Sequence, residues 1–509
     1  TRVGCLADVE EMMRWLGERR EFLAVDVETE GLNVGRDRIR LCQFGDPARG
    51  WALDWRDWRG VCREVIEGYE GNTVAHNLLY DSKMLKADGV VVPQRWAHDT
   101  LVMVFLKNPA GRMSLKQAAA RYVDPRAAAG QSALRSLFAA TGWDWATVPT
   151  DHPTYWTYGV LDTCLTALLA GALYPEIRTS YSRAYETELA AIHCLREAEL
   201  AGMMTDPEYR RRASDRLRAE IEWLRPQIPC ENPASDRQVI ELLQGQGARW
   251  SVYTEKGNLS VDKHVLAMLA SEYPVAALIG QHRSKAKLLG SYMEKIDELA
   301  VDDVVYANTR PLGARTGRMS VTDPPLQTLP RGRVVRDAFV AREGHALILT
   351  DFKTMEMRAL ASLAREQTML DAIARGDDLH DFVARALYGD AFTGPQRTLC
   401  KNGGYAFIFG AGTEKFAATA GISAGEAAPF LHRYSETFPG VGAFMGRVSV
   451  EVVRRAGGRK QGYGYVTLVD GRRLPVEADE AYKGVNYLIQ GSCAVSTKER
   501  IVALDAVGL

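Results

Sequence analysis

The first clear pattern along the chain is an alternation of apolar and polar positions in EFLAVDVETE, residues 21–30. Leu23, Val25 and Val27 alternate with Asp26 and Glu28, and this period of two predicts a β-strand. Asp26 and Glu28 are two residues apart, so both carboxylates leave the same face of that strand. Two such neighbours repel unless a cation lies between them, and magnesium prefers oxygen ligands of this kind. The pair alone is also compatible with a solvated sheet face.

Two later segments carry polar pairs at helical spacing. AHNLLYDSKML (75–85) places Asn77 and Asp81 four residues apart, and YGVLDTCLTALL (158–169) does the same for Tyr158 and Asp162. Residues four apart share one face of a helix. Each pair by itself is compatible with a helix cap or an exposed polar face.

From about residue 183 the pattern becomes helical, and two segments are rich in basic residues, DPEYRRRASDRLRAEIEWLRPQI and HRSKAKLLGSYMEKI. A basic helix face is usually only a solvated surface. The alternative is a mobile arm whose lysines and arginines bind duplex phosphates. These helices lie between the polar pairs of the first third and a candidate nucleotide-binding stripe in the last third, and this position favours the second interpretation.

The last third combines a predicted strand with a predicted helix. In LILTDFKTMEMRALASLA (347–364), Leu347, Leu349 and Asp351 share one strand face, and a helical pattern with Glu356 follows. In PQRTLCKNGGYAFIFGAG (395–412) four side chains recur every fourth residue: Arg397, Lys401, Tyr405 and Phe409. On a helix they form one slanting stripe, in which two cations suit a triphosphate and two rings suit a sugar and base. An ordinary amphipathic helix is the alternative, although Gly403 and Gly404 argue against it.

Composition narrows the class of protein. The 509 residues are 46% hydrophobic and 25% charged, which is typical of a multidomain globular protein, and no apolar stretch approaches the roughly 20 residues needed to cross a bilayer. Eight cysteines without a C-x-x-C pair indicate reduced thiols, and we expect a cytoplasmic protein, in a bacterial host if phage-encoded. A formal net charge of -1 argues against indiscriminate DNA coating but permits a local basic channel.

The first three motifs, in this order and spacing, resemble the exonuclease motifs of the DEDD superfamily in its tyrosine-containing branch, over residues 15–175. The resemblance implies that Asp26, Glu28 and Asp162 hold one metal, that Asp26 bridges to a second, and that Asp81 fixes the second mostly through water. Tyr158 would orient the attacking water, and Asn77 would contact the substrate. Two Mg²⁺ ions, or Mn²⁺, and a single-stranded DNA 3′ end are the implied cofactors and substrate.

The segment from about residue 183 to the end resembles family A DNA polymerases. DFKTMEMRAL is similar to their motif A, and R-x-x-x-K-x-x-x-Y-x-x-x-F-G is similar to motif B, with Phe409 in place of a usual tyrosine. TGRMSVTDPPLQTLP and VNYLIQGSCAVSTKE are similar to two further motifs. The family's second carboxylate, in an H-D-E sequence, does not occur, and we expect that a final palm hairpin is missing from the chain.

The second resemblance implies a role for each matched residue. Asp351 would bind two metals, Glu356 would exclude a ribose 2′-hydroxyl, and Lys401 would donate a proton to pyrophosphate. The remaining implied contacts are to the triphosphate by His380, Arg397 and Lys401, to the incoming nucleotide by Tyr405 and Phe409, and to the primer–template minor groove by Arg318, Gln327, Asn486 and Gln490.

The expected fold is therefore an α/β exonuclease domain at residues 1–180, RNase H-like with a mixed sheet and flanking helices, followed by an α+β right-hand polymerase domain at 181–509. The expected subdomains are a thumb at about 205–300, a palm at about 181–204, 301–362 and 441–509, and fingers at about 363–440. We expect a monomeric, phage-type, proofreading DNA polymerase that uses primer–template DNA and deoxynucleoside triphosphates, with no membrane contact. The alternatives are an exonuclease whose polymerase-like region only binds primer–template, and a non-enzymatic binding module.

Overall fold

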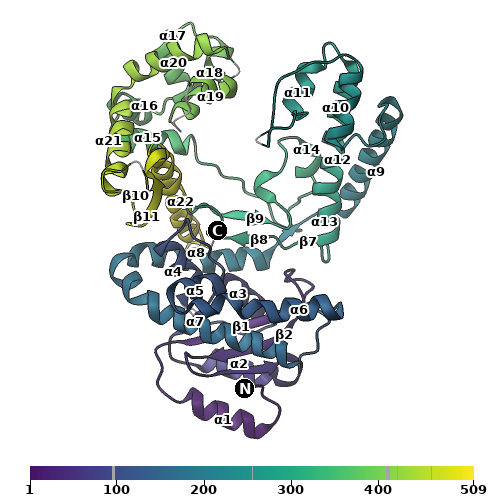
Figure 1. Cartoon of the computed structure of the whole chain (residues 1–509), viewed down its shortest axis with the longest axis vertical. Coiled ribbons are helices and arrows are strands. Elements are labelled where there is room, and N and C mark those ends of the chain that lie inside the picture. Colours follow the sequence, from purple (N-terminus) through teal and green to yellow (C-terminus); the bar gives the residue numbers. More distant parts are fainter. Residues whose placement is uncertain (94–97, 255, 409–412, 421, 460, 509) are drawn as a thin grey trace. The chain divides into compact units, whose positions relative to one another are not determined.

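The computed structural model describes the chain except residues 94–97, 255, 409–412, 421, 460 and 509 (Figure 1). It divides into two compact units. Unit 1 contains residues 1–198, 310–320 and 350–509, and unit 2 contains residues 199–309 and 321–349. The two units are defined by compactness and do not correspond to the predicted domains. The predicted boundary at residue 180 and the predicted subdomains therefore stay predictions.

The N-terminal part of unit 1 is built on a five-stranded sheet with the order β3-β2-β1-β4-β5. The strands are β1 (Leu23–Thr29), β2 (Ile39–Gly45), β3 (Gly50–Asp54), β4 (Thr73–Ala75) and β5 (His98–Asp99). β1 pairs antiparallel with β2 and parallel with β4. The predicted strand at residues 21–30 and the predicted mixed sheet are both confirmed.

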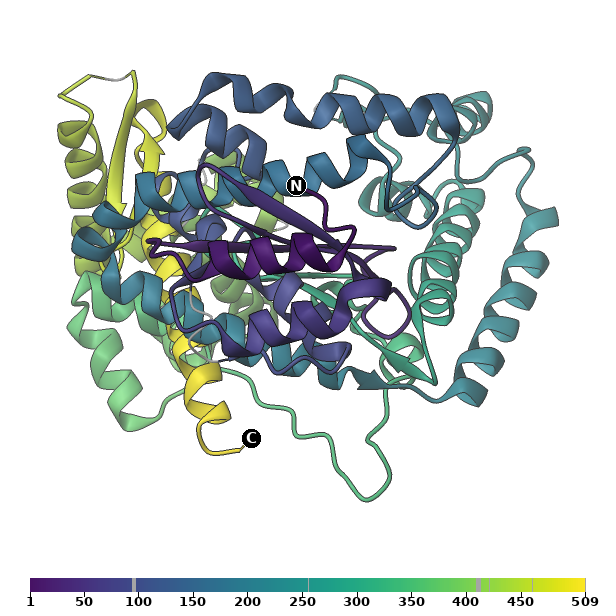
Figure 2. The same ribbon diagram turned by 90° about the horizontal axis from the view of Figure 1, so that it is seen from below.

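Helices flank this sheet. They are α1 (Leu6–Leu16), α2 (Trp55–Gly68), α3 (Leu78–Ala87), α4 (Thr100–Lys107), α5 (Leu115–Tyr122), α6 (Ser132–Thr141), α7 (Pro153–Ser180) and α8 (Ser182–Ala201). α1 crosses the strands in the view of Figure 2, and its Trp15 lies against Trp51 of β3 with ring centroids 6.2 Å apart. α7 packs on β1, β2 and β3.

Two glycines allow α7 to approach the sheet closely. A Cβ on Gly159 of α7 would lie 2.3 Å from Gln43 Nε2 of β2, and a Cβ on Gly45 of β2 would lie 2.3 Å from Thr163 Oγ1 of α7. No real Cβ tolerates such distances, so a larger residue at either position would push the helix away. The helix that carries Tyr158 and Asp162 is thereby held against the strand beside β1.

By length and composition α7 could also cross a membrane, and in the described part of the chain it alone meets that test. The expectation that no apolar stretch reaches this length is therefore wrong. Half of its most apolar window is buried inside the protein, where it covers the sheet. A core helix satisfies the same test, so the finding is weak support for a membrane span.

The remainder of unit 1 is mainly helical around one apolar core. Its elements are α15 (Met355–Ala364), α16 (Gln367–Arg375), α17 (Leu379–Tyr388), α18 (Gly394–Ile408), α19 (Thr413–Ala420), α20 (Ala424–Thr437), α21 (Pro439–Arg455), the hairpin of β10 (Tyr463–Thr467) and β11 (Arg473–Glu477), and α22 (Lys483–Asp505). α15 packs against α21 and α22.

The strand predicted at residues 347–351 is not formed. Residues 341–354 have no regular helix or strand, Leu349 is 93% exposed, and Asp351 is exposed. An apolar stretch becomes a strand only when a neighbouring strand satisfies its backbone groups. Among the described residues no strand pairs with this segment.

Unit 2 is a helical unit with short strands. Its elements are β6 (Met203–Met204), α9 (Pro207–Leu224), α10 (Asp236–Gly245), α11 (Lys263–Leu269), α12 (Pro274–Leu288), a π-helical turn (Leu289–Met293), α13 (Glu294–Leu299), β7 (Val304–Val305) and α14 (Arg333–Arg336). The chain crosses the unit boundaries at β8 (Asn308–Arg310) and β9 (Ser320–Thr322). Some of the basic residues predicted to bind phosphates pair inside the unit, as Lys285 does with Glu220 and Arg218 with Glu294.

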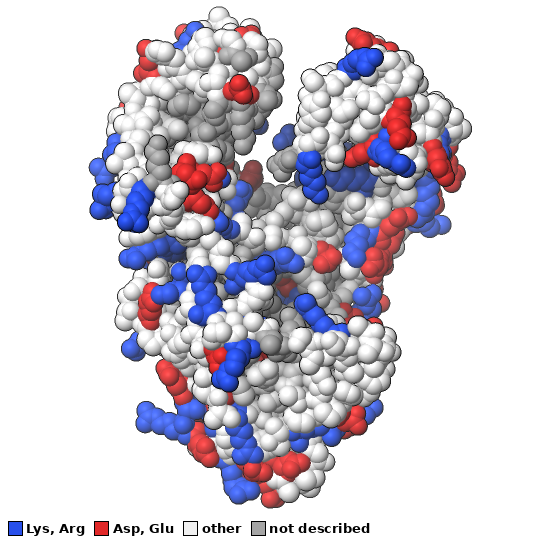
Figure 3. All heavy atoms as spheres, viewed as in Figure 1, with Lys and Arg blue, Asp and Glu red and all other residues white. Residues whose placement is uncertain are grey.

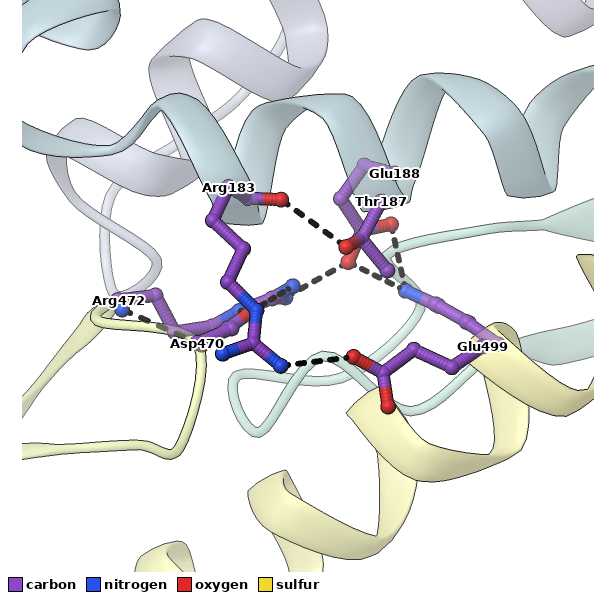
Figure 4. A network of polar contacts seen from close by, with 7 residues as sticks. Arg183, Thr187, Glu188, Asp470, Arg472 and Glu499 are labelled. Carbon is purple, nitrogen blue, oxygen red and sulfur yellow. Dashed lines mark hydrogen bonds and ion pairs between the residues drawn. The ribbon is translucent and has the colours of Figure 1, made fainter.

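A buried charge network joins α8, the β10–β11 turn and α22 within unit 1 (Figure 4). Glu188 accepts hydrogen bonds from Arg472 Nη1 at 2.7 Å and from Lys498 Nζ at 2.6 and 2.8 Å. Asp470 pairs with the same arginine at 2.6 Å, and the paired side chains are at most 1% exposed. Two anions thus balance two cations that water cannot reach.

We expect Glu188→Gln to destabilise unit 1 by about 3–5 kcal/mol, because one buried anion would then face two buried cations. Glu499→Gln is the matched control, since Glu499 pairs with Arg183 on the same two helices but both side chains are exposed (Figure 4). An exposed pair contributes about 0–1 kcal/mol. Urea unfolding measures both variants, and equal midpoints for the two would contradict a structural role of the buried network.

Candidate active sites

The N-terminal motifs converge at one end of the sheet. Asp26 and Glu28 lie on β1, Asp81 lies in the first turn of α3, and Tyr158 and Asp162 lie one turn apart on α7. The backbone N–H of Val27 donates to Asp81 Oδ1 at 3.4 Å, which places α3 directly beside β1. The structure therefore brings together side chains that are up to 136 positions apart in the sequence.

Asn77 lies at the start of α3 with a left-handed backbone, φ 79°. This conformation is held by Asp99, whose carboxylate accepts from the backbone N–H of Asn77 at 3.0 Å and of Leu78 at 2.9 Å. Asp99 also caps α4 by accepting from the N–H of Leu101 at 2.8 Å. One buried carboxylate thus orients the turn that presents Asn77 and fixes the start of α4.

The carboxylates of this cluster disfavour one another's ionisation. Burial raises the pKa of Asp26 to about 7, against the charge of Lys116, which lowers it. Burial first, and the neighbouring Asp26 second, raise the pKa of both Glu28 and Asp81 well above the usual range. Like charges that are buried together raise each other's pKa unless a cation lies among them.

Lys116 is a residue of this site that the sequence motifs did not reveal. It is the second residue of α5, it forms an ion pair with Asp162, and its Nζ lies 4.0 Å from the centroid of the Tyr158 ring. Burial lowers its pKa to about 8, partly offset by Asp26 and Glu28. Its signal in the sequence is a lysine inside a short, otherwise alanine-rich helix, which does not distinguish it from a surface residue.

A cavity of about 410 Å³ opens beside the cluster. Its lining includes Asn77, Lys116, Tyr158, Asp162 and Arg310. The pocket therefore offers a carboxylate, a phenol, an amide and two cations to one bound group. Arg310 comes from a segment remote in sequence from the N-terminal motifs, which did not predict it.

The donor set fits a hard divalent cation in its chemistry. Carboxylate oxygens predominate, and the amide of Gln43, opposite Asp26 across the β1–β2 ladder, is buried with no hydrogen-bond partner among the described residues. As the side chains stand, no three Asp, Glu, His or Cys residues in the described part of the chain enclose a metal ion. The cluster therefore has the ligands for magnesium, but its side chains do not yet surround an ion.

The pKa of Asp26 predicts how the metal-free protein responds to pH. This pKa is raised in the folded state, so the stability associated with protonated Asp26 is present below about pH 4 and is lost as the pH rises through about 7. Glu28 and Asp81 shift in the same direction. We expect the melting temperature in EDTA to fall between about pH 5 and about pH 7.5, and Asp26→Asn to reduce that fall. An equal slope in both proteins would contradict the assignment.

Most of the second set of predicted residues lies in unit 1, outside its N-terminal sheet. Arg318 Nη1 lies 3.7 Å from Glu356 Oε1 at the first turn of α15. Gly317, with φ +82°, leaves room for the buried Arg472, because a Cβ there would lie 3.0 Å from Arg472 Nη1. The buried charge network therefore supports the loop that presents Arg318 to Glu356.

The predicted triphosphate ligands lie on α17 and α18. Arg397 pairs with Asp378 at 3.2 Å and with Asp381, while Lys401 is exposed one turn further along α18. Burial lowers the pKa of His380 on α17; the charge of Asp378 opposes this shift, and the charges of Lys401 and Arg397 add to it. The three residues thus lie within electrostatic range of one another.

The other predicted contacts are placed as follows. Asn486 and Gln490 lie one turn apart on α22, and the buried Oδ1 of Asn486 has no hydrogen-bond partner among the described residues. Gln327 is exposed in unit 2. Phe409 lies outside the described residues, and Tyr405 lies on α18 with a side chain that is not described. Asp351 is exposed and forms no hydrogen bond or ion pair with another described residue.

A family model for "DNA polymerase family A" matches residues 208–507, more than half of the chain. The chain belongs to DNA polymerase family A. It is 29% identical to a DNA polymerase of Mycobacterium phage D29 and 28% identical to one of Mycobacterium phage L5, in each case over 98% of this chain and 86% of the relative. These relatives confirm a DNA polymerase of the phage-like type predicted from the sequence.

A solved structure has the same fold. The polymerase domain of Pol1 from M. smegmatis, in complex with a DNA primer–template and a dNTP, matches with a TM-score of 0.80 and 23% identity, over 100% of this chain and 90% of that one.

The surface charges of the present chain are mixed. On the face drawn in Figure 3, basic and acidic residues are interspersed. This distribution agrees with the near-zero net charge.

Proposed function

We propose that this family A polymerase extends a primer along a DNA template and also removes mismatched 3′ ends with its N-terminal exonuclease site. The observation that carries the second activity is the convergence of Asp26, Glu28, Asp81 and Asp162 beside Tyr158. The phage D29 and L5 relatives support the first, since their match extends over 98% of the chain. The M. smegmatis Pol1 domain binds primer–template and a dNTP, and we propose the same substrates here.

In the exonuclease site, Asp26, Glu28 and Asp162 would hold one magnesium ion, and Asp26 and Asp81 a second. A bound metal pair supplies a hydroxide-like nucleophile and stabilises charge on the reacting phosphate. Tyr158 would hold the attacking water by its hydroxyl, and Asn77 would orient the terminal nucleotide in the adjoining cavity. The chain's part is to keep these groups aligned beside β1, the central strand of the sheet.

In the polymerase site, phosphoryl transfer demands positioning and cations around the triphosphate. Asp351 would hold magnesium, His380 and Arg397 would bind phosphate oxygens, and Lys401 would protonate the departing pyrophosphate. Arg397 must first release Asp378 and Asp381. The exposed Lys401 needs no such exchange.

Selection between substrates would use neighbouring groups. Glu356, held by Arg318, would lie under the sugar and exclude a 2′-hydroxyl. Arg318, Gln327, Asn486 and Gln490 would test pair shape in the minor groove, where the acceptors N3 and O2 occupy similar places in every correct pair. Tyr405 and Phe409 would pack on the incoming nucleotide. We propose a monomer that acts in the cytoplasm of a bacterial host.

A gel assay with a 5′-labelled primer–template tests the proposal. With magnesium and four nucleotides we expect extension, and with the nucleotides withheld we expect shortening from the 3′ end. EDTA should stop both reactions. Extension without shortening would refute the exonuclease, shortening without extension would leave a nuclease that only binds primer–template, and neither would leave a binding module.

A further inference from the structure

Lys116 occupies a position that is costly for a lysine. Its side chain is 7% exposed, and it lies at the second residue of α5, where the positive end of the helix dipole repels a cation. Burial of an ammonium group is unfavourable unless anions compensate it. The compensating anions here are Asp162 by direct contact, and Asp26 and Glu28 through the field of their charges.

The start of α5 is hydrogen-bonded to His76, which lies between β4 and α3. His76 Nε2 lies 2.9 Å from the carbonyl oxygen of Met113, and its Nδ1 lies 2.8 Å from Thr100 Oγ1. Met113 directly precedes Ser114, the N-cap residue of α5. The hydrogen bond from His76 to Met113 therefore holds the start of the helix that carries Lys116, and both residues line the cavity beside the exonuclease site.

The ammonium also orients both functional side chains of α7. It pairs with Asp162 and lies 4.0 Å from the ring centroid of Tyr158, so it bridges the proposed metal ligand and the proposed water-orienting phenol. It also lies in the electrostatic field of Asp26 and Glu28. A divalent cation that bound among these carboxylates would compete with the ammonium for Asp162.

We propose that Lys116 is a positioning residue that acts as the internal counter-ion of the metal-free exonuclease site and yields Asp162 when a divalent cation binds. The proposal rests on the exonuclease function proposed above. It explains why the described carboxylates do not enclose a metal as they stand, since the ammonium is paired with one of the ligands. Lys116 thereby keeps a cluster of like charges folded at the cost of some metal affinity.

The test measures Mn²⁺ binding by electron paramagnetic resonance in the full chain. All proteins carry Asp351→Ala, so that the signal reports on the exonuclease site. Lys116→Met removes the charge but keeps most of the side-chain length, and we expect Mn²⁺ to bind about tenfold more tightly, because a competing cation is gone. Lys116→Arg keeps a cation and should retain the parent affinity. The matched control is Lys107→Met, which removes a lysine paired with Glu176 in the same part of the chain.

Thermal unfolding supplies a second readout. Without metal, Lys116→Met should melt below the parent protein, because the carboxylates lose their counter-ion; at saturating Mn²⁺ the difference should disappear. A lysine that only fills space would lower the melting temperature equally with and without metal and leave Mn²⁺ affinity unchanged, and that result would overturn the proposal. If Lys116→Met does not fold, Lys116→Gln carries the same expectations.

The outcomes separate this proposal from the function on which it rests. Mn²⁺ binding and DNA digestion by the parent protein, with unchanged affinity in Lys116→Met, would overturn the role of Lys116 alone. Absence of both Mn²⁺ binding and digestion in the parent protein would overturn the exonuclease function and this proposal with it. Tighter binding in Lys116→Met but not in Lys107→Met supports both.

Discussion

Replacement of Asp351 by alanine is expected to lower primer extension by about 10²–10³-fold, the order of loss seen when one group that stabilises transition-state charge is removed. Residues 341–354 have no regular structure, and Asp351 has no hydrogen-bond or ion-pair partner among the described residues. Its exposure means that the substitution removes no buried contact. The fold should therefore be unaffected, and digestion from the 3′ end should continue.

Single-turnover extension by one nucleotide measures this effect. Asp390→Ala is the matched control, since Asp390 is also an exposed carboxylate of unit 1 and its side chain is 93% exposed beside Arg385. The control should extend at the parent rate. Extension by Asp351→Ala at that same rate would remove Asp351 from the polymerase site.

Replacement of Asp26 by alanine is expected to have the opposite effect on the two activities, with digestion lowered by about 10²–10³-fold and extension retained. Asp26 is proposed to hold both metals of the exonuclease site, so its loss should affect both. The pKa of Asp26, raised to about 7 by burial, indicates that its charge is costly in the metal-free fold. The variant should therefore unfold no more easily than the parent at about pH 8, and lost digestion could not be attributed to misfolding.

Digestion of labelled single-stranded DNA at saturating enzyme measures the second effect. Asp124→Ala is the matched control, because Asp124 pairs only locally with Arg126 on the exposed surface of the same part of the chain. It should digest DNA like the parent. A single variant that abolishes both activities would contradict two separate sites.

The sequence by itself determined the local elements and their polar faces. The period of two in residues 21–30 places Asp26 and Glu28 on one face of β1, and the spacing of four places Tyr158 and Asp162 on one face of α7. These relations depend only on strand and helix geometry, so they are fixed before any tertiary contact forms. The order and spacing of the motifs also predicted the family. For the polymerase part, the family model and the phage relatives support that prediction.

The tertiary structure decided which distant side chains meet. Lys116 reaches Asp162 across 46 positions, and Glu188 reaches Arg472 across 284, and neither pair has a periodic signal in the sequence. The reverse holds for residues 347–351, whose pattern predicts a strand that the described residues leave unpaired and exposed. The periodicity of a sequence specifies which side chains share one face of a helix or strand, but not which other part of the chain packs on that face. A strand and a buried ion pair both require a complement from elsewhere in the chain, because backbone groups and charges are stable away from water only when they are paired.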